Sequence, residues 1–397
     1  MLHAQENVIE QLLKANPTYF KTLTDNPYKY RLQILYTQID RDAENKAQFT
    51  THAYRVNSNE YFYPASTVKL AASVLALEKI NRLKIDKSTT FNILKNRPTQ
   101  LEVLTDTSSA NGKPSIEHYI KKILLVSDNE AYNRLYEFLG QKDFNKTMAS
   151  KGFEGVRFTH RLQTSIPLLE NQYTNPVEFV DEQGRLIYQQ KEQFNKKQIV
   201  STYPIILGKG IMNDSGRIIP HPVNFSFKNA YPLQAQHDFL KRLIFPASYE
   251  KKDRFKLSPE DYSFLYRYMS EYPTESKHPN YSADSTIGPA YCKFLYYGGD
   301  KKANMNPNVR IFNKVGDAYG FLLDNAYFVD FQNKVEFMVT AAIYCNEDEI
   351  FNDDKYDYET IGFPFFKHLG EVIYQHELSR PKKNQPHLDY LKFNYAD

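Results

Sequence analysis

Alternating apolar and polar residues predict β-strands near both ends of the chain. Residues 30–42 alternate in this way, and residues 47–56 are their expected hairpin partner across a short polar turn. Three runs of β-branched and aromatic residues, separated by short polar turns, predict strands in the last third of the chain: 309–316, 320–331 and 334–346.

Helical spacing dominates between these two groups of strands. Residues 6–23 have the spacing of an amphipathic helix, and residues 61–83 read as one long helix with apolar residues on every side. Residues 115–140 predict two helices interrupted at 127–129, with Gly140 suited to the closing position. Further helices are expected at 233–245, 258–270 and 361–378.

The order of these elements predicts the α+β fold class. Strands at both ends with helices between them favour one antiparallel sheet formed from N- and C-terminal strands, plus a helical lobe. We expect a single domain over 1–397, with 25–60 and 305–397 in the sheet lobe and 61–304 in the mainly helical lobe. Residues 171–229 carry a hairpin pattern and recurrent Gly and Pro, which predicts a β-rich insertion.

Composition narrows the class of protein. The net charge is +3, from 50 basic and 47 acidic residues, and the basic clusters are short and scattered, which argues against a nucleic-acid partner. Cys292 and Cys345 have no zinc-ligand spacing, so we expect two small buried hydrophobes, although they could pair if the protein is exported. No transmembrane segment is expected, because no run of about 18 apolar residues exists. Residues 2–5 resemble the end of a cleaved signal peptide.

Ser66 and Lys69 lie at the start of the apolar helix. Residues three apart share a helix face, so the amine can reach the hydroxyl. Burial and the positive end of the helix dipole both lower the pKa of a lysine there, which makes Lys69 a candidate base for Ser66. The same S-x-x-K pattern recurs at Ser248 and Ser379, however, and it also fits an N-cap serine followed by a solvent-facing lysine.

Two further motifs follow in order along the chain, Ser127-Asp128-Asn129 and Lys314-Val315-Gly316. Alone, the first fits a capping turn between helices and the second an edge strand protected by a lysine. Together with S-x-x-K, the set resembles the class A β-lactamases and penicillin-binding proteins. The segments that carry the resemblance are "YPASTVKL", "SDNEAYNRLYEFLG" and "NKVGDAYGFLLDNAYFVD".

The resemblance implies a β-lactamase/transpeptidase-like fold and a covalent mechanism. Ser66 would be the nucleophile that becomes acylated, and Lys69 would accept or relay its proton. Ser127 would pass a proton to the leaving nitrogen. The backbone N–H groups of Ser66 and Asp317 would form the oxyanion hole. No cofactor and no metal are expected.

The resemblance also implies residues that bind the substrate. Lys314 would lie against Ser127 and attract the substrate's carboxylate, with Gly316 beside it in the same motif, and Asn129 would bind a side-chain amide. The residue before Gly316 is usually a small hydroxyl residue in the family, whereas here it is Val315. Valine donates no hydrogen bond, so recognition of the usual β-lactam carboxylate is expected to be weakened.

A second departure concerns the release of the acyl group. Class A β-lactamases carry a glutamate two residues after an arginine, and this glutamate activates the hydrolytic water. Alignment on "THRLQTSIP" places Arg161 at the arginine and Gln163 where the glutamate is expected. A neutral amide holds a water but takes no proton from it. Glu170 is the nearest carboxylate and would have to reach in from a remodelled loop.

These observations favour an active-site serine acyl hydrolase that acts on a β-lactam or a related amide, with slow deacylation. The alternatives are a peptidoglycan enzyme of the penicillin-binding/DD-peptidase type, or a binding protein that holds cell-wall peptides without turnover. A Ser-His-Asp hydrolase is disfavoured, because no G-x-S-x-G sequence is present. The expected partner is therefore a β-lactam or a peptidoglycan stem peptide. Such substrates occur outside the cytoplasm, which favours an exported, periplasmic protein.

Overall fold

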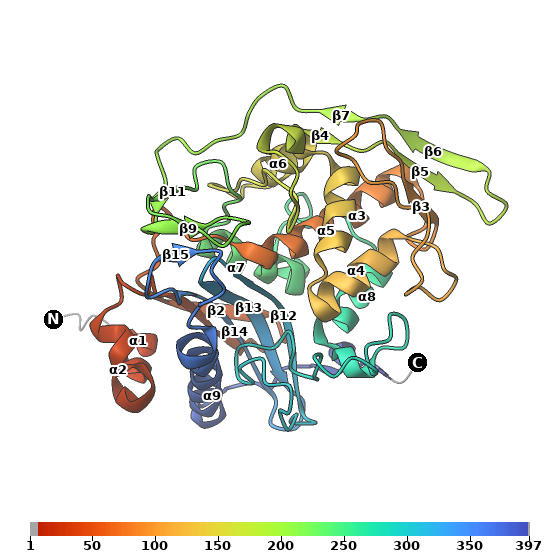
Figure 1. Ribbon diagram of the computed structural model, residues 1–397. Coiled ribbons are helices and arrows are strands. Elements are labelled where there is room, and N and C mark those ends of the chain that lie inside the picture. Colours follow the sequence, from red (N-terminus) through yellow and green to blue (C-terminus); the bar gives the residue numbers. More distant parts are fainter. Residues whose placement is uncertain (1–6, 396–397) are drawn as a thin grey trace.

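The computed structural model describes residues 7–395 and has the α+β fold predicted from the sequence (Figure 1). A five-stranded antiparallel sheet has the strand order β12-β13-β14-β1-β2. Its strands are β1 (Gln33–Arg41), β2 (Ala47–Tyr54), β12 (Val309–Ala318), β13 (Phe321–Asp330) and β14 (Val335–Tyr344). Pairing of β1 with β14, in which Tyr36 is opposite Val339, joins the two ends of the chain, and β12 forms one edge of the sheet.

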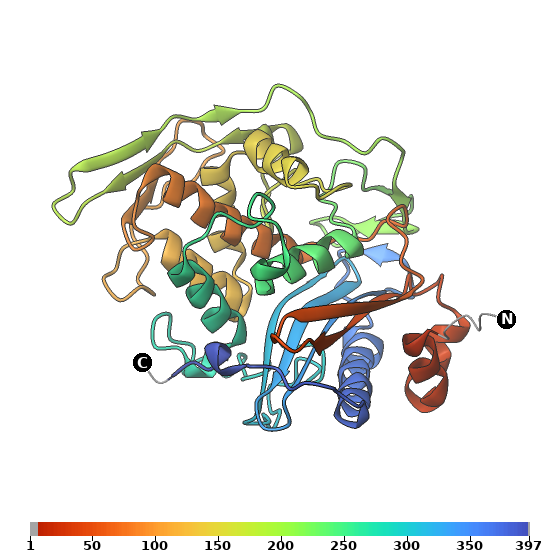
Figure 2. The same ribbon diagram turned by 180° about the vertical axis from the view of Figure 1, so that it is seen from behind.

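The two faces of the sheet carry alternate residues of each strand. On one face, Tyr36 and Ile311 pack with the helices α1, α2 and α9. On the other, Leu35 and Tyr327 pack into the core of the helical lobe. In Figure 2, α9 (blue) and the α1–α2 pair (red) lie below the sheet, with the helical lobe above it. The covering helices are α1 (Val8–Ala15), α2 (Pro17–Asp25) and α9 (Phe363–Ser379).

The helical lobe is built around α3 (Val68–Leu83). Every residue of α3 from Val68 to Leu77 is buried, as the apolar composition of this segment predicted. The other helices of the lobe are α4 (Ile116–Val126), α5 (Asn129–Leu139), α6 (Gln141–Ser150), α7 (Leu233–Ile244) and α8 (Pro259–Ser270). The helix α3 contacts both α4 and α5, and hydrogen bonds from Lys69 hold the turn between these two helices close to the start of α3.

Two expectations about helices were wrong in detail. The single amphipathic helix expected at 6–23 is two helices, because Pro17 has no N–H to continue α1 and instead begins α2. The helix expected from residue 61 begins later, with one 3₁₀ turn at Ala65–Thr67 before α3. Residues 61–64 have no regular secondary structure and lead into this turn.

The insertion predicted at 171–229 is β-rich, as expected. The hairpin of β5 (Val177–Val180) and β6 (Leu186–Gln190) turns at residues 181–185, pairs with β3 (Thr90–Ile93) and projects from the helical lobe (Figure 1). Further along, β9 pairs in parallel with β15 (Ile350–Phe351), so the insertion reaches the C-terminal part of the chain. Its remaining strands are β4 (Tyr173–Thr174), β7 (Gln193–Phe194), β8 (Ile206–Leu207), β9 (Gly210–Met212), β10 (Ile218–Ile219) and β11 (Val223–Asn224).

Cys292 and Cys345 are both buried and free, which agrees with their interpretation as small hydrophobic residues. Among residues 7–395, no helix is long and apolar enough to cross a membrane. The proposed signal-peptide remnant at residues 2–5 lies outside the described part of the chain.

Candidate active site

The side chains of Ser66, Lys69, Ser127 and Lys314 meet at one point between the two lobes. Lys69 Nζ lies 2.7 Å from Ser66 Oγ and 3.3 Å from Ser127 Oγ. Lys314 Nζ lies 2.8 Å from Ser127 Oγ. The four groups come from the start of α3, the α4–α5 turn and the edge strand β12, so all three sequence motifs converge here.

The backbone immediately before Ser66 is strained. Ala65, immediately before it, has φ +46°, a conformation that costs an alanine roughly 1–3 kcal/mol. Ser66 then lies in the 3₁₀ turn that precedes α3, where the first N–H groups of a helix have no intrahelical acceptor. The Ser66 N–H is therefore free to donate to an oxyanion.

The turn at 127–129 caps a helix and also directs two side chains toward Lys69. Ser127 has φ +60° and ends α4, while Asp128 caps α5 by accepting a hydrogen bond from the Ala131 N–H at 2.8 Å. Of the three residues in this motif, Asp128 therefore caps the helix, as the capping-turn interpretation expects. Ser127 and Asn129, on either side, direct their side chains toward Lys69.

The burial of Lys69 favours a neutral amine. Its side chain is fully buried, and Nζ donates to the Ser127 carbonyl oxygen and, at 2.7 Å, to Asn129 Oδ1. Both of these oxygens only accept, so two N–H bonds satisfy them, and a neutral amine at this position would keep its lone pair for the Ser66 O–H. Burial lowers the pKa of Lys69 well below its usual value, and the charge of Lys314 lowers it further, against Asp128 and Asp317, which raise it.

Lys314 lies on β12 with only 2% of its surface exposed. Its ammonium donates to Ser127 Oγ and, at 2.9 Å, to the Val315 carbonyl oxygen. Burial lowers the pKa of Lys314, while Cys292 and Asp317 raise it. The lysine thus places a second amine next to the Ser127 hydroxyl.

Gly316 allows β12 to approach the nucleophile closely. A Cβ at this position would lie 2.9 Å from the Pro64 carbonyl oxygen, 2.9 Å from the Ser66 nitrogen and 3.0 Å from the Thr67 nitrogen. Such separations are too short for real Cβ atoms, so only glycine fits. The role of Gly316 in this structure is therefore to admit the backbone of the 3₁₀ turn.

The Asp317 N–H points away from the sheet. Tyr319 and Gly320 form a two-residue turn with φ +54° and +76°, which makes Ala318 and Phe321 the closing pair of the β12–β13 hairpin. Hydrogen-bonded pairs alternate along an antiparallel ladder, so the N–H of Asp317 is directed outward, to the open edge. This N–H and that of Ser66 are the two donors available for an oxyanion.

The loop that carries Gln163 is fixed to α5. The Asn133 side chain donates to the Leu162 carbonyl oxygen at 3.0 Å and accepts from the Leu162 N–H at 2.8 Å. Arg161 is buried and pairs with Glu137 at 3.0 Å. Gln163 itself has φ +49°, and its Oε1 accepts a 2.6 Å hydrogen bond from Asn129 Nδ2. The side chain aligned with the missing glutamate therefore reaches the site.

Glu170 does not reach the site. Arg97 binds its carboxylate with two hydrogen bonds, at 2.9 and 3.0 Å, and Thr99 Oγ1 donates a third at 2.8 Å. These contacts lower the pKa of Glu170, with the Arg97 hydrogen bond as the largest cause. Glu170 was expected to reach the site only from a remodelled loop, and it does not do so. Arg97 holds its carboxylate outside the cavity, and no sequence motif indicated this partner.

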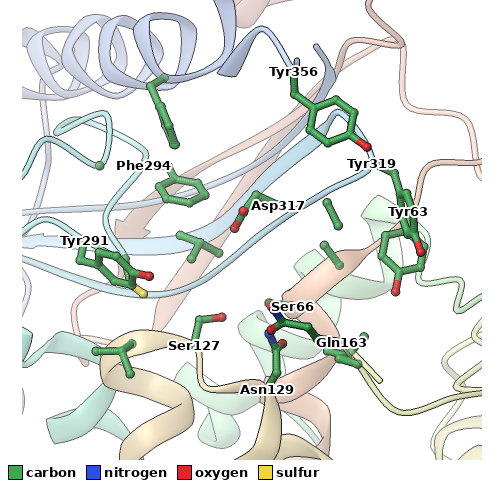
Figure 3. A pocket seen from close by; sticks show the side chains of 18 of the residues that line it. Tyr63, Ser66, Ser127, Asn129, Gln163, Tyr291, Phe294, Asp317, Tyr319 and Tyr356 are labelled. Carbon is green, nitrogen blue, oxygen red and sulfur yellow. The ribbon is translucent and has the colours of Figure 1, made fainter. Parts of the chain in front are cut away.

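A cavity of about 640 Å³ opens beside Ser66. Ser66, Ser127, Asn129, Gln163 and Asp317 line it (Figure 3). Its volume suits a small molecule or a short peptide segment. The aromatic residues of the walls were not predicted from the sequence: Tyr63, Tyr291, Phe294, Tyr319, Tyr356 and Phe363. Tyr63 and Tyr319 adjoin the first and third motifs and could have been found from that position; the others come from loops without a recognisable signal.

The chain resembles known proteins in sequence pattern and in fold. The protein-family model described as "Beta-lactamase enzyme family" matches residues 19–206 of the chain. The chromosome-encoded beta-lactamase of Vibrio parahaemolyticus is 14% identical, with a TM-score of 0.49, over 92% of this chain and 98% of that chain. The class A beta-lactamase from Clostridium kluyveri is 13% identical, also with a TM-score of 0.49 and the same coverage. A comparison with curated proteins gave no match.

A mutant of PBP-A, solved as an acyl-enzyme complex with penicillin G, is 13% identical over 92% of this chain and 96% of that chain. Its TM-score is 0.50, and at this identity the likeness concerns the fold alone. The chain thus has the fold of β-lactamase/transpeptidase-like serine hydrolases, and its residues 19–206 match the β-lactamase enzyme family.

Proposed function

We propose that the protein is a serine acyl hydrolase that forms a covalent acyl-enzyme on Ser66. The observation that carries this proposal is the 2.7 Å separation of Ser66 Oγ from a fully buried lysine amine. A neutral amine at this distance can take the serine proton directly, as a general base must. The substrate class is an amide, which includes β-lactams.

The first half-reaction follows from the contacts. Lys69 Nζ takes the proton of Ser66 as Oγ bonds to the substrate's carbonyl carbon, and the N–H groups of Ser66 and Asp317 stabilise the oxyanion. The proton then passes from Lys69 through the Ser127 hydroxyl to the leaving nitrogen. The C–N bond breaks, which leaves an ester on Ser66 and a free amine, and Lys314 holds the Ser127 hydroxyl in place through the 2.8 Å contact.

The second half-reaction is expected to be slow. Hydrolysis requires a water to lose its proton and attack the ester, and the side chain at the position of the usual base is the Gln163 amide, which takes no proton. This observation favours a second candidate function, that of a penicillin-binding/DD-peptidase-like enzyme or a binder that is acylated without turnover. We include in the proposal an exported location, where such substrates are found.

The experiment is covalent labelling followed by intact-mass spectrometry. A fluorophosphonate and a panel of acyl donors, including a chromogenic cephalosporin and a neutral activated ester, should each add one mass increment on Ser66. The Ser66→Ala variant should add none. Ser248 provides a matched control, because it begins another S-x-x-K sequence but is exposed and lies outside the cavity.

Labelling that persists in Ser66→Ala, or that is lost in Ser248→Ala, would contradict the proposed mechanism. The lifetime of the Ser66 adduct distinguishes the two candidate functions. Release of hydrolysed product from the chromogenic cephalosporin indicates a lactamase, whereas an adduct stable for hours indicates a penicillin-binding protein.

A further inference from the structure

The Asp317 carboxylate lies at the cavity wall, on the edge strand β12. Alternation along β12 places the side chains of Val315 and Asp317 on the face of the strand opposite Lys314 and Gly316. Within residues 7–395, no hydrogen bond or ion pair engages this carboxylate. Figure 3 shows it directed into the open space of the cavity, between Phe294 and the Ser66 side. The carboxyl group is therefore available to a ligand.

The charges that line the cavity are mainly negative. Three exposed acids, Asp317, Asp354 and Glu359, contribute to its wall, against one exposed cation, Lys301. Lys69 and Lys314 are buried, and their amines contact Ser66 and Ser127 instead. At this wall an anionic substrate would meet more like charge than opposite charge, and a cationic one would meet the reverse.

The walls of the cavity suit a cation as well. Phe294 and Tyr356 lie on either side of Asp317 (Figure 3), and Tyr291 follows beside Phe294. The faces of aromatic rings attract an ammonium group. Tyr319, the next ring along the wall, already has the Lys228 amine 5.3 Å from its centre. In contrast, Val315 provides no hydroxyl for a carboxylate.

We propose that the acyl donor of this site carries an ammonium group, rather than a carboxylate, on the part of the molecule that lies against β12. Asp317 pairs with this ammonium and acts as the specificity-determining residue. The inference rests on the proposed function, because it concerns the substrate that acylates Ser66. Desolvation by the surrounding cavity walls raises the pKa of the Asp317 carboxyl, whereas Lys69 and Lys314 lower it, and a bound ammonium would lower it further.

The test compares three cephalosporins that share one chromogenic ring system and differ in one substituent. The ring carboxylate is free in the first, a methyl ester in the second and an aminoethyl amide in the third. Acylation of Ser66 is followed by stopped-flow absorbance and intact mass. In the unmodified protein, the cationic compound should acylate at least about tenfold faster than the anionic one, with the neutral ester between them.

Asp317→Asn removes the charge and keeps the size and the backbone N–H. This variant should bring the cationic and anionic compounds to within about threefold of each other, by slowing the first and accelerating the second. Asp214→Asn is the matched control, because Asp214 is exposed and outside the cavity, and it should leave the order unchanged.

The possible failures are distinguishable. Adducts on Ser66 that form fastest with the anionic compound, or a charge order that Asp317→Asn leaves unaltered, would overturn this inference and leave the acyl-enzyme proposal standing. The absence of any Ser66 adduct, from these compounds and from the fluorophosphonate, would contradict the proposed function and this inference together.

Discussion

Lys314 and Ser127 are 187 residues apart in the sequence, yet the lysine Nζ lies 2.8 Å from the serine Oγ. The contact joins the edge strand of the sheet to the α4–α5 turn of the helical lobe. It therefore depends on how the two lobes pack, whereas the 3.3 Å contact of Lys69 with Ser127 depends on packing of α3 against α4 and α5 within the helical lobe.

If Lys314 and Ser127 act as one unit, their effects should not add. Lys314→Met and Ser127→Ala should each lower the acylation rate by about 10²–10³, because each interrupts the path of the proton to the leaving group. The double variant should be no slower than the worse single variant by more than about threefold. A double variant whose loss equals the product of the single losses would show that the two side chains act independently. Lys197→Met, which is exposed and outside the cavity, is the control and should leave the acylation rate unchanged.

The pH dependence of acylation should reveal the base. Acylation requires neutral Lys69, so its rate should rise as the pH increases through the pKa of Lys69, which burial and Lys314 hold well below the usual value. Removal of the positive charge in Lys314→Met raises the pKa of Lys69, and the rising limb should move to higher pH. The pH–rate profile is measured by stopped-flow acylation. If its rising limb moved to lower pH in Lys314→Met, Lys69 would be excluded as the base.

Gly316→Ala should separate β12 from the nucleophile. The added methyl group would lie 2.9 Å from the Ser66 nitrogen, so the strand must shift, and acylation should fall at least about 100-fold with the loss of oxyanion geometry. Overpacking of this kind lowers the free energy of unfolding by about 1–3 kcal/mol. Gly184→Ala, in the β5–β6 turn, has φ +77° and open space around it. It should lose a similar amount of stability and retain full acylation, as thermal melts and stopped-flow assays can show.

How much of this site the sequence predicts depends on the kind of contact. Ser66 and Lys69 are three residues apart on consecutive helical turns, so local geometry alone predicts their contact. The convergence of Ser127 and Lys314 with them depends on packing, and only the resemblance to a known family indicated it.

The loops show where sequence reasoning fails. Gln163 was placed correctly near the site, because the alignment ran through the buried Arg161. Glu170 was not, because its position depends on a bidentate pair with Arg97, and no local pattern reveals that partner. Likewise, the single helix expected at 6–23 ignored the missing N–H of Pro17.

Gln163→Glu should accelerate deacylation. The new carboxylate would lie beside Asn129 Nδ2, at the position of the 2.6 Å hydrogen bond, and could take a proton from a water near the ester. We expect the acyl-enzyme to decay at least about tenfold faster, measured as loss of the mass adduct. Glu170→Gln is the comparison: because Arg97 and Thr99 hold this carboxylate away from the site, the decay rate should stay within about twofold. A large effect of Glu170→Gln would mean that the loop rearranges during turnover.

The insertion should influence substrate binding without touching Ser66. Gly208 has φ +71°, and a Cβ there would clash with the Phe351 ring and lie 2.7 Å from the Glu349 carbonyl oxygen. Residues 352–356, which follow directly, include Asn352, Asp354 and Tyr356 of the cavity wall. Gly208→Ala should therefore displace this wall and raise KM by about three- to tenfold, with little change in the rate of fluorophosphonate labelling.

The matched control for Gly208→Ala lies in the same insertion. Gly216 has φ +77°, but nothing stands within 4 Å of the position that a Cβ would take. Gly216→Ala therefore bears only the backbone strain, about 1–2 kcal/mol of stability, and should leave KM unchanged. Because both variants force alanine into a left-handed conformation, a difference in KM between them isolates the contact with Phe351. Equal KM values in the two variants would mean that the insertion does not position the wall of the active-site cavity.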